Sequence, residues 1–409
     1  MKWSKYNTSW NKDGKMYIYN SIHNKLAVST DEEFSNTEYL NQLSCEGFRV
    51  NSNETEEQTA REKIKEKIHT SETLACWIFL TNDCNLACPY CFEKDSLLNK
   101  PANYMEKETC IKTVEWILRK ASEKKVKKIQ ITMTGGEPLI NKEAIRTLTE
   151  GFSNNEFEVN FNMITNGVLL DYETIKELKT MGITSYQITL DGPAKIHDSR
   201  RIYKDGRGTF NIIVNNVMKT LRSDDEIQFT IRINVDEGNC KHIGSLLSLL
   251  KRVNLNRYTA LCISDTLMTD GTDTGNMLKE NIRIIREAVE HGFKIAYGEI
   301  NNCWMMSEFW YMVNVDGKLY KCPSLVGDEK YSVGSVTESK LNQEYIRQIG
   351  LEPWESCINC ELAGVCCGGC PYRSVVSGGK WHERKVCRKN YMKELIQLKY
   401  SKEINIGEV

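Results

Sequence analysis

The sequence predicts an α/β protein made of parallel strand–helix units, with cysteine groups at two places in the chain. Short apolar runs alternate with longer helical stretches between about residues 74 and 291, as parallel βα units require. The first apolar run is followed by three closely spaced cysteines, at the kind of strand end where α/β barrels place their chemistry. These two observations predict a barrel-like central part with a reactive loop.

The N-terminal part, residues 1–73, is predicted to be a small α+β segment. The runs 15–19 and 25–29 are expected to pair as strands, and a short helix is expected over 31–44. Opposite charges three and four residues apart over 61–67 indicate a solvated helix.

The central part is predicted to hold six strands and six helices in alternation. The expected strands are 74–81, 129–134, 157–165, 185–190, 228–235 and 258–264. The expected helices are 105–122, 142–152, 172–181, 209–222, 241–252 and 275–291.

The C-terminal part has its own local signals. Two strand-like runs flank Asp316-Gly317, which is a strong hairpin signal and places Cys322 on the returning strand. A glycine-rich cysteine loop over 357–370 and a closing helix over 388–400 complete this part.

Three thiolates in the first loop, Cys84, Cys88 and Cys91, suit a cubane iron–sulfur cluster. A 4Fe–4S cluster normally takes four protein thiolates, so this loop leaves one iron for a small molecule. A zinc loop or three unrelated thiols are the alternatives for the bare pattern. A second motif, the turn Gly135-Gly136-Glu137-Pro138 after the next strand, allows close backbone approach.

With these two motifs in this order, the sequence resembles the radical S-adenosylmethionine (SAM) enzymes. The resemblance implies a partial (β/α)6 TIM-like barrel, in which the open iron chelates the amino and carboxylate groups of SAM. It also implies SAM contacts from nine residues: Tyr90, Phe92, Gly135, Gly136, Glu137, Asn166, Thr189, Asp191 and Arg201. Arg232 and Asn234 are further candidates that share one face of the fifth strand, although the sequence does not say whether that face points inward.

The second cysteine group resembles the SPASM extension of radical SAM enzymes that modify peptides. It comprises seven residues: Cys303, Cys322, Cys357, Cys360, Cys366, Cys370 and Cys387. Structural zinc sites are the alternative, because paired cysteines often bind zinc inside cells, but seven ligands divide poorly into groups of four.

The SPASM resemblance implies two auxiliary 4Fe–4S clusters, and therefore three clusters in the whole chain. One auxiliary cluster takes Cys357, Cys360, Cys366 and Cys387. The other takes Cys303, Cys322 and Cys370 and is one ligand short. We expect its open iron to bind a cysteine of the substrate; closure by Cys262 or Cys367 is the alternative.

The domain prediction has three parts. Residues 1–73 form a barrel cap or a module that grips the leader of a precursor peptide by adding a strand. Residues 74–295 form the radical SAM partial barrel, and residues 296–409 form the SPASM domain.

Composition limits the partners and the compartment. The chain has 54 basic and 55 acidic residues and no basic region that would favour nucleic acid. It shows no signal peptide and no apolar run of membrane-spanning length. We expect a cytoplasmic protein of a reduced, anaerobic or microaerobic cell.

The resemblance implies a peptide maturase similar to the thioether-forming enzymes of sactipeptides and ranthipeptides, with a flavodoxin or ferredoxin as reductant. A rival is an anaerobic sulfatase-maturating enzyme, which makes formylglycine. That family has an aspartate after the cysteine matching Cys322 and a glutamine before the GGEP turn, where this chain has Pro323 and Thr134. The sequence is also compatible with a carbon–carbon peptide cyclase of the same superfamily, a peptide-modifying oxidase, or a non-catalytic iron–sulfur or zinc protein.

Overall fold

The fold is a long twisted sheet whose central strands are parallel. A computed structural model describes residues 1–30, 32–91, 93, 101–265, 274–296, 303–383 and 386–400. The sheet has ten strands in the order β12-β11-β10-β9-β8-β7-β6-β13-β14-β15. Its six central strands are β6 (Thr73–Phe79), β7 (Lys128–Thr134), β8 (Glu158–Ile164), β9 (Ile183–Thr189), β10 (Gln228–Val235) and β11 (Thr259–Asp265).

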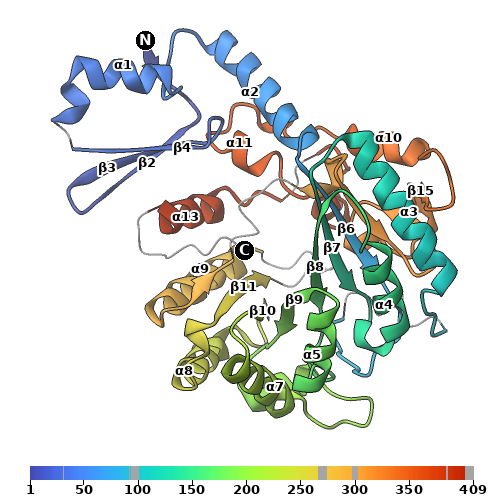
Figure 1. Cartoon of the computed structure of the whole chain (residues 1–409). Coiled ribbons are helices and arrows are strands. Elements are labelled where there is room, and N and C mark those ends of the chain that lie inside the picture. The colour runs from blue at the N-terminus through green and yellow to red at the C-terminus, as the bar shows by residue number, and fades with distance from the viewer. Residues whose placement is uncertain are drawn as a thin grey trace.

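Each central strand pairs with its neighbour in parallel, and a helix follows each strand around the outside of the sheet (Figure 1). These helices are α3 (Lys107–Lys124), α4 (Lys142–Gly151), α5 (Tyr172–Thr180), α7 (Phe210–Ser223), α8 (Ile243–Arg252) and α9 (Thr274–Glu290). The predicted strands and helices are confirmed with their ends within about two residues, and so is the predicted barrel-like α/β class. A short helix that was not predicted, α6 (Ala194–Arg200), lies between β9 and α7.

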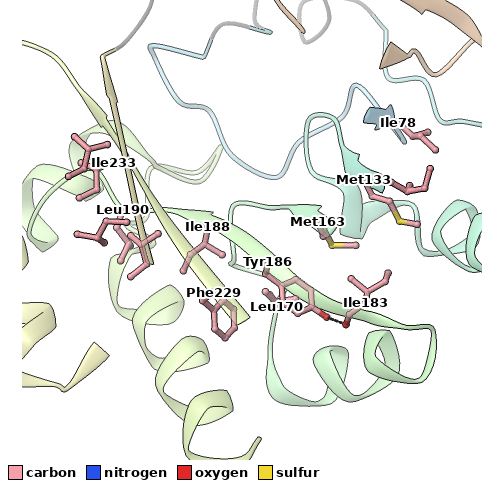
Figure 2. Packing of buried hydrophobic residues seen from close by; sticks show 14 of the residues in the cluster. Ile78, Met133, Met163, Leu170, Ile183, Tyr186, Ile188, Leu190, Phe229 and Ile233 are labelled. Carbon is pink, nitrogen blue, oxygen red and sulfur yellow. Dashed lines mark hydrogen bonds between the residues drawn. The ribbon is translucent and has the colours of Figure 1, made fainter. Parts of the chain in front are cut away.

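The main core lies between the strands and these outer helices. Alternate residues of each strand face this layer, as the two-residue period of a strand requires. Figure 2 shows Phe229, Ile233 and Ile188 packed there, together with Tyr186, whose hydroxyl donates to the Ile183 carbonyl at 2.7 Å. The opposite residues of the same strands therefore line the inner face.

The N-terminal segment is more extensive than predicted. The predicted pair, β3 (Lys15–Asn20) and β4 (Lys25–Ser29), is confirmed as antiparallel and gains a third strand, β2 (Asn7–Lys12). The short strands β1 (Lys2–Trp3) and β5 (Arg49–Val50) pair separately. The remaining elements are the helices α1 (Thr37–Cys45) and α2 (Asn53–His69).

One helix boundary in this segment was wrong. The helix expected over 31–44 begins only at Thr37, because the Asn36 side chain accepts the backbone N–H groups of Glu38 and Tyr39 and caps it there.

The C-terminal part continues the central sheet. The strand β13 (Trp310–Val313) pairs in parallel with β6, and β14 (Lys318–Tyr320) and β15 (Gly334–Ser335) follow in antiparallel order. The hairpin around Asp316-Gly317 is confirmed, although Cys322 lies two residues beyond the returning strand. On the other edge of the sheet, β12 (Lys294–Ile295) pairs with β11.

Short helices carry the rest of the C-terminal part. They are α10 (Gln343–Ile349), α11 (Ala363–Cys366), α12 (Pro371–Val376) and α13 (Lys389–Tyr400). The last of these confirms the predicted closing helix and packs against α9, while α11 packs against α2 (Figure 1).

Candidate functional site

The first cysteine loop follows β6 and is hydrogen-bonded to residues 202 and 203, which are more than 100 residues away in the sequence. The backbone N–H of Ala87 donates to the Ile202 carbonyl at 2.8 Å, and Leu86 forms a bridge with Tyr203. Cys84, Cys88 and Cys91 are all partly buried. Burial raises the pKa of the Cys84 thiol to about 12 and that of Cys91 to about 11, so in the cluster-free chain these thiols hold their protons at neutral pH.

The glycine turn packs directly against this loop. A Cβ on Gly135 would lie 2.3 Å from the carbonyl oxygen of Thr81, and one on Gly136 would lie 2.2 Å from that of Asp83. The backbone N–H of Gly136 donates to the Thr81 carbonyl at 2.9 Å. Both positions therefore need glycine because the turn touches the backbone that leads into the cysteines.

Glu137 links the ends of two neighbouring strands, β7 and β8. It is fully buried, and its carboxylate accepts from Leu139 N at 3.1 Å, Thr165 Oγ1 at 2.8 Å and Asn166 N at 2.8 Å. Burial raises the pKa of Glu137, and these hydrogen bonds oppose the rise. Its contacts in the protein give it a positioning role between β7 and β8.

Asn166 reaches from the end of β8 to the cysteine loop. Its Nδ2 donates to Asn85 Oδ1 at 2.7 Å and lies 3.9 Å from the sulfur of Cys84. Thr189 ends β9 on the same edge of the sheet and is buried. The structure thus brings the predicted residues of β7, β8 and β9 together around the loop.

A buried polar network holds the cysteine loop on the side of β9 and β10. The Tyr90 hydroxyl donates to Asp191 Oδ2 and accepts from Arg201 Nη1 at 2.9 Å. The Arg200 guanidinium lies 4.6 Å from the Tyr90 ring centroid and pairs with Asp236 through two hydrogen bonds of 3.0 and 2.7 Å. This network holds the Cys88 to Cys91 segment against β9 and β10.

His197 is a site residue to which the sequence analysis gave no role. It is fully buried, its Nδ1 accepts from the backbone N–H of Asp191 at 3.3 Å, and its Nε2 lies 3.0 Å from Thr209 Oγ1. That hydroxyl donates to the Arg201 carbonyl, so we assign the Nε2–H tautomer. Burial, with the charges of Arg201 and Arg200, lowers the pKa of His197 to about 3 and keeps it neutral.

The site still offers polar atoms to a ligand. Among the described residues, Asn85 Nδ2, Glu93 Oε2 and Arg201 Nε are buried and have no hydrogen-bond partner. A buried polar atom without a partner is costly, so these atoms fit a polar group bound beside the cysteines. The three thiols and this polar lining suit a 4Fe–4S cluster and SAM. The expected contact Phe92 lies outside the described residues.

Three cysteines of the second group also come together. The thiol of Cys303 donates to the sulfur of Cys370, and this hydrogen bond, with burial and the charges of Cys370 and Cys322, raises the pKa of Cys303. Burial, with the charge of Cys370, raises the pKa of Cys322 to about 12. The hydrogen bond from Cys303 lowers the pKa of Cys370. The predicted set of Cys303, Cys322 and Cys370 is therefore one neighbourhood in the fold.

The two spare thiols form hydrogen bonds with other groups, and Cys367 belongs to the core cluster against which Cys303 and Cys322 pack. Cys262, on β11, accepts from Arg232 Nη1 at 3.8 Å. Cys367 is buried, and its thiol donates to the Gly364 carbonyl at 3.7 Å. Neither contact is with the Cys303 set.

The remaining set is less closely linked. Cys360 and Cys387 both lie near the ammonium group of Lys389, Cys357 is buried, and Cys360 donates its backbone N–H to the Cys357 carbonyl at 2.8 Å. Within the described part of the chain, no three Cys, His, Asp or Glu side chains converge as the ligands of a single metal ion do.

Part of the chain matches a known class of proteins. Residues 78–224 match the Radical SAM superfamily. The solved structures with similar folds include anSMEcpe with bound AdoMet, at a TM-score of 0.63 and 19% identity, covering 82% of this chain and 98% of that one. The chain therefore carries a radical SAM domain.

Three relatives are similar to this chain over more than half of its length. The chain is 24% identical to the radical SAM cyclopropyl synthase TigE of Paramaledivibacter caminithermalis, over 87% of this chain and 80% of that protein. It is 21% identical to a cysteine-type anaerobic sulfatase-maturating enzyme of Clostridium novyi, over 71% of this chain and 85% of that protein. It is 27% identical to the sporulation killing factor maturation protein SkfB of Bacillus subtilis, over 54% of this chain and 50% of that protein.

A further solved structure is that of Streptococcus suis SuiB bound to the precursor peptide SuiA. Its fold matches with a TM-score of 0.56 at 15% identity and covers 94% of this chain and 98% of that one. In the described part of the chain, we find no helix with the length and apolar character needed to span a membrane.

Proposed function

We propose that this protein is a radical SAM enzyme that modifies a ribosomally made precursor peptide by joining a cysteine sulfur to a carbon. The observation that carries the thioether reaction is the gathering of the three thiols of Cys303, Cys322 and Cys370. Three protein ligands leave one position of an auxiliary 4Fe–4S cluster for a substrate thiolate. A cluster held by Cys84, Cys88 and Cys91 would supply, with SAM, the 5'-deoxyadenosyl radical that takes one hydrogen atom from carbon, and the auxiliary cluster would accept the electron released when the substrate thiolate bonds to that carbon.

The residues of the chain position and shield this chemistry. Gly135, Gly136 and Asn166 fix the cysteine loop against the ends of β7 and β8. Tyr90 and Arg201 close the side toward β9, and the unpartnered Arg201 Nε offers a donor to a bound carboxylate.

The proposal extends to the other parts of the chain. We infer a second auxiliary cluster at Cys357, Cys360, Cys366 and Cys387, a flavodoxin or ferredoxin as electron donor, and a cytoplasmic location. The three-stranded sheet of β2, β3 and β4 ends in β4, to which the leader of a precursor peptide can add a strand. The similarity to a fold solved with a bound precursor peptide supports a peptide substrate.

A carbon–carbon bond within the peptide is the second candidate. Its support is the similarity to a cyclopropyl synthase along 87% of this chain. Formylglycine formation has less support, because Pro323 follows Cys322 directly and Thr134 precedes the glycine turn, where sulfatase-maturating enzymes have an aspartate and a glutamine.

The test is anaerobic coexpression with the cysteine-containing peptide encoded beside the gene, followed by accurate mass, thiol alkylation and fragmentation. A thioether removes two hydrogens and one alkylatable thiol. Loss of two hydrogens with every thiol intact indicates a carbon–carbon bond, and an aldehyde in place of cysteine indicates formylglycine. Reconstituted, reduced enzyme that forms no 5'-deoxyadenosine would contradict the enzymatic proposal altogether.

A further inference from the structure

Arg232 lies on the inner face of the sheet, beside Thr189 at the end of β9. Its strand neighbours Ile231 and Ile233 are buried in the core between the sheet and the outer helices, where Figure 2 shows Ile233. Because successive strand residues face opposite sides, Arg232 and Asn234 point away from the helices. This settles the direction that the sequence left open.

Neighbouring strands place two more polar side chains beside this arginine. In the parallel register, Arg232 pairs with Thr189 of β9 on one side and with Cys262 of β11 on the other. Paired residues of adjacent strands share a face, so these three side chains form a row across the inner surface.

The guanidinium of Arg232 is held by neutral groups. Its Nε donates to Asn234 Oδ1 at 2.8 Å and its Nη1 to the sulfur of Cys262 at 3.8 Å. Among the residues that the structure describes, no carboxylate forms an ion pair with it. Arg200 differs, because Asp236 binds it through two nitrogens.

A partly buried guanidinium with only neutral partners is suited to an incoming anion. Its planar set of donors matches a carboxylate, which can accept two hydrogen bonds at once. Asn234 and Cys262 fix the orientation of the side chain, so little conformational freedom remains to be lost when a ligand binds.

We propose that Arg232 binds a carboxylate of the peptide substrate, from an aspartate, a glutamate or the chain terminus, and so selects which residue faces the reacting carbon. This inference rests on the proposed peptide-modifying function and names a feature of its substrate. SAM also has a carboxylate. However, Arg201 already provides a cation at the cysteine loop, whereas Arg232 lies toward β11, beyond Asp191, which accepts the backbone N–H of Asn234 at 3.0 Å.

The experiment measures peptide binding to the reconstituted, SAM-loaded full-length enzyme. The probe is a fluorescein-labelled synthetic copy of the cysteine-containing peptide encoded beside the gene. In separate versions, each Asp and Glu is changed singly to Asn or Gln, and the C-terminal carboxylate is changed to an amide. We expect Arg232→Gln to weaken binding of the unchanged peptide about 10- to 100-fold, as loss of a charge-assisted hydrogen bond does. Arg232→Lys should weaken it less, since the charge stays but the two-pronged geometry is lost.

One amide version of the peptide should bind wild-type enzyme as weakly as the unchanged peptide binds Arg232→Gln. Combining that amide peptide with Arg232→Gln should weaken binding little further, because partners that contact each other are coupled in a double-mutant cycle. Arg146→Gln is the matched control, because Arg146 pairs with Glu177 on the outer helices at 3.1 Å. It should leave every affinity at the wild-type value.

Three outcomes would overturn the inference. A raised SAM dissociation constant for Arg232→Gln in equilibrium dialysis would assign the residue to SAM. If Arg232→Gln weakens the binding of peptides without a carboxylate equally, Arg232 has a structural role in the strand instead. If wild-type enzyme modifies all the amide peptides normally, Arg232 is not a carboxylate anchor, while the proposed function stands. If wild-type enzyme modifies no peptide at all, the proposed function itself is wrong.

Discussion

The two cysteine regions are built in different ways. The Cys84 loop is fixed by contacts from the ends of several neighbouring strands, including the Gly135 turn and Asn166. The Cys303 to Cys387 region stands on turns and short helices, among them α11 and α12, which have four and six residues. The first site is therefore ordered by the sheet, while the second depends on its own ligands and on a few side-chain links.

The largest expected effect separates the chemistry of the two regions. Cys84→Ala should lower 5'-deoxyadenosine formation by more than about 100-fold, since loss of a group that merely orients a metal ligand already costs about 10- to 100-fold in metal affinity. Cys322→Ala should reduce the modified peptide far more than it reduces SAM cleavage. Chromatographic assay of both products from anaerobic reactions checks this, and equal loss of both in Cys322→Ala would remove the distinction.

The next effect probes how tightly the sheet holds the first loop. Gly135→Ala should destabilise the cluster-free chain by about 1 to 3 kcal/mol more than Gly206→Ala, because its Cβ would meet the Thr81 carbonyl. Gly206 is the matched control, since it also has a positive φ but no atom within 4 Å of the added Cβ. Urea unfolding compares the two, and equal destabilisation would mean that backbone conformation alone accounts for the glycine.

Acid should weaken the first region through His197. The pKa of His197 is about 3 in the folded chain against an ordinary 6.5. Below pH 6.5 the unfolded chain therefore binds a proton at this histidine that the folded chain does not bind, and the free energy of unfolding falls as the pH drops from 6.5 toward 3. Between pH 6.5 and 5 the wild type should lose about 2 kcal/mol relative to His197→Gln. Urea unfolding across this range tests it, with exposed His382→Gln as the control that keeps the wild-type pH dependence.

The smallest expected effect on stability concerns the side-chain contacts of Glu361 in the second cysteine region. Glu361 accepts from Thr8 at 2.5 Å and lies 2.8 Å from Lys389 and 3.0 Å from Lys393, which together lower its pKa to about 2 against the effect of burial. Glu361→Gln should cost about 1 kcal/mol or less, as partly exposed charge pairs do. Glu329→Gln, which removes an exposed pair with Lys318, should cost still less in the same thermal unfolding assay.

The sequence predicted the repeating architecture well and the contacts within it poorly. Strand and helix windows follow from local periodicity, so β6 to β11 and their helices were predicted to within about two residues. The pairing of β13 with β6 joins segments more than 200 residues apart, and no local pattern encodes it.

The same holds for the site. The cysteine and glycine motifs identified the loop and the turn, because their chemistry depends on spacing along the chain. The roles of His197 and of the Arg200–Asp236 pair depend on burial and on partners from other elements, and only the fold supplies these. The adjacent His197 and Asp198 were the available signal in the sequence. Asp198 accepts the backbone N–H groups of Thr209 and Phe210, where α7 begins.

The pairing of β13 with β6 has a consequence for dividing the protein. If the chain were cut after residue 296, the backbone groups of β6 that now bond to β13 would form an unprotected sheet margin, a template for association with other copies. An excised barrel should therefore precipitate or self-associate rather than behave as a smaller catalyst. The C-terminal region covers the edge strand of the barrel in addition to supplying cysteines, so the two parts must be engineered as one unit.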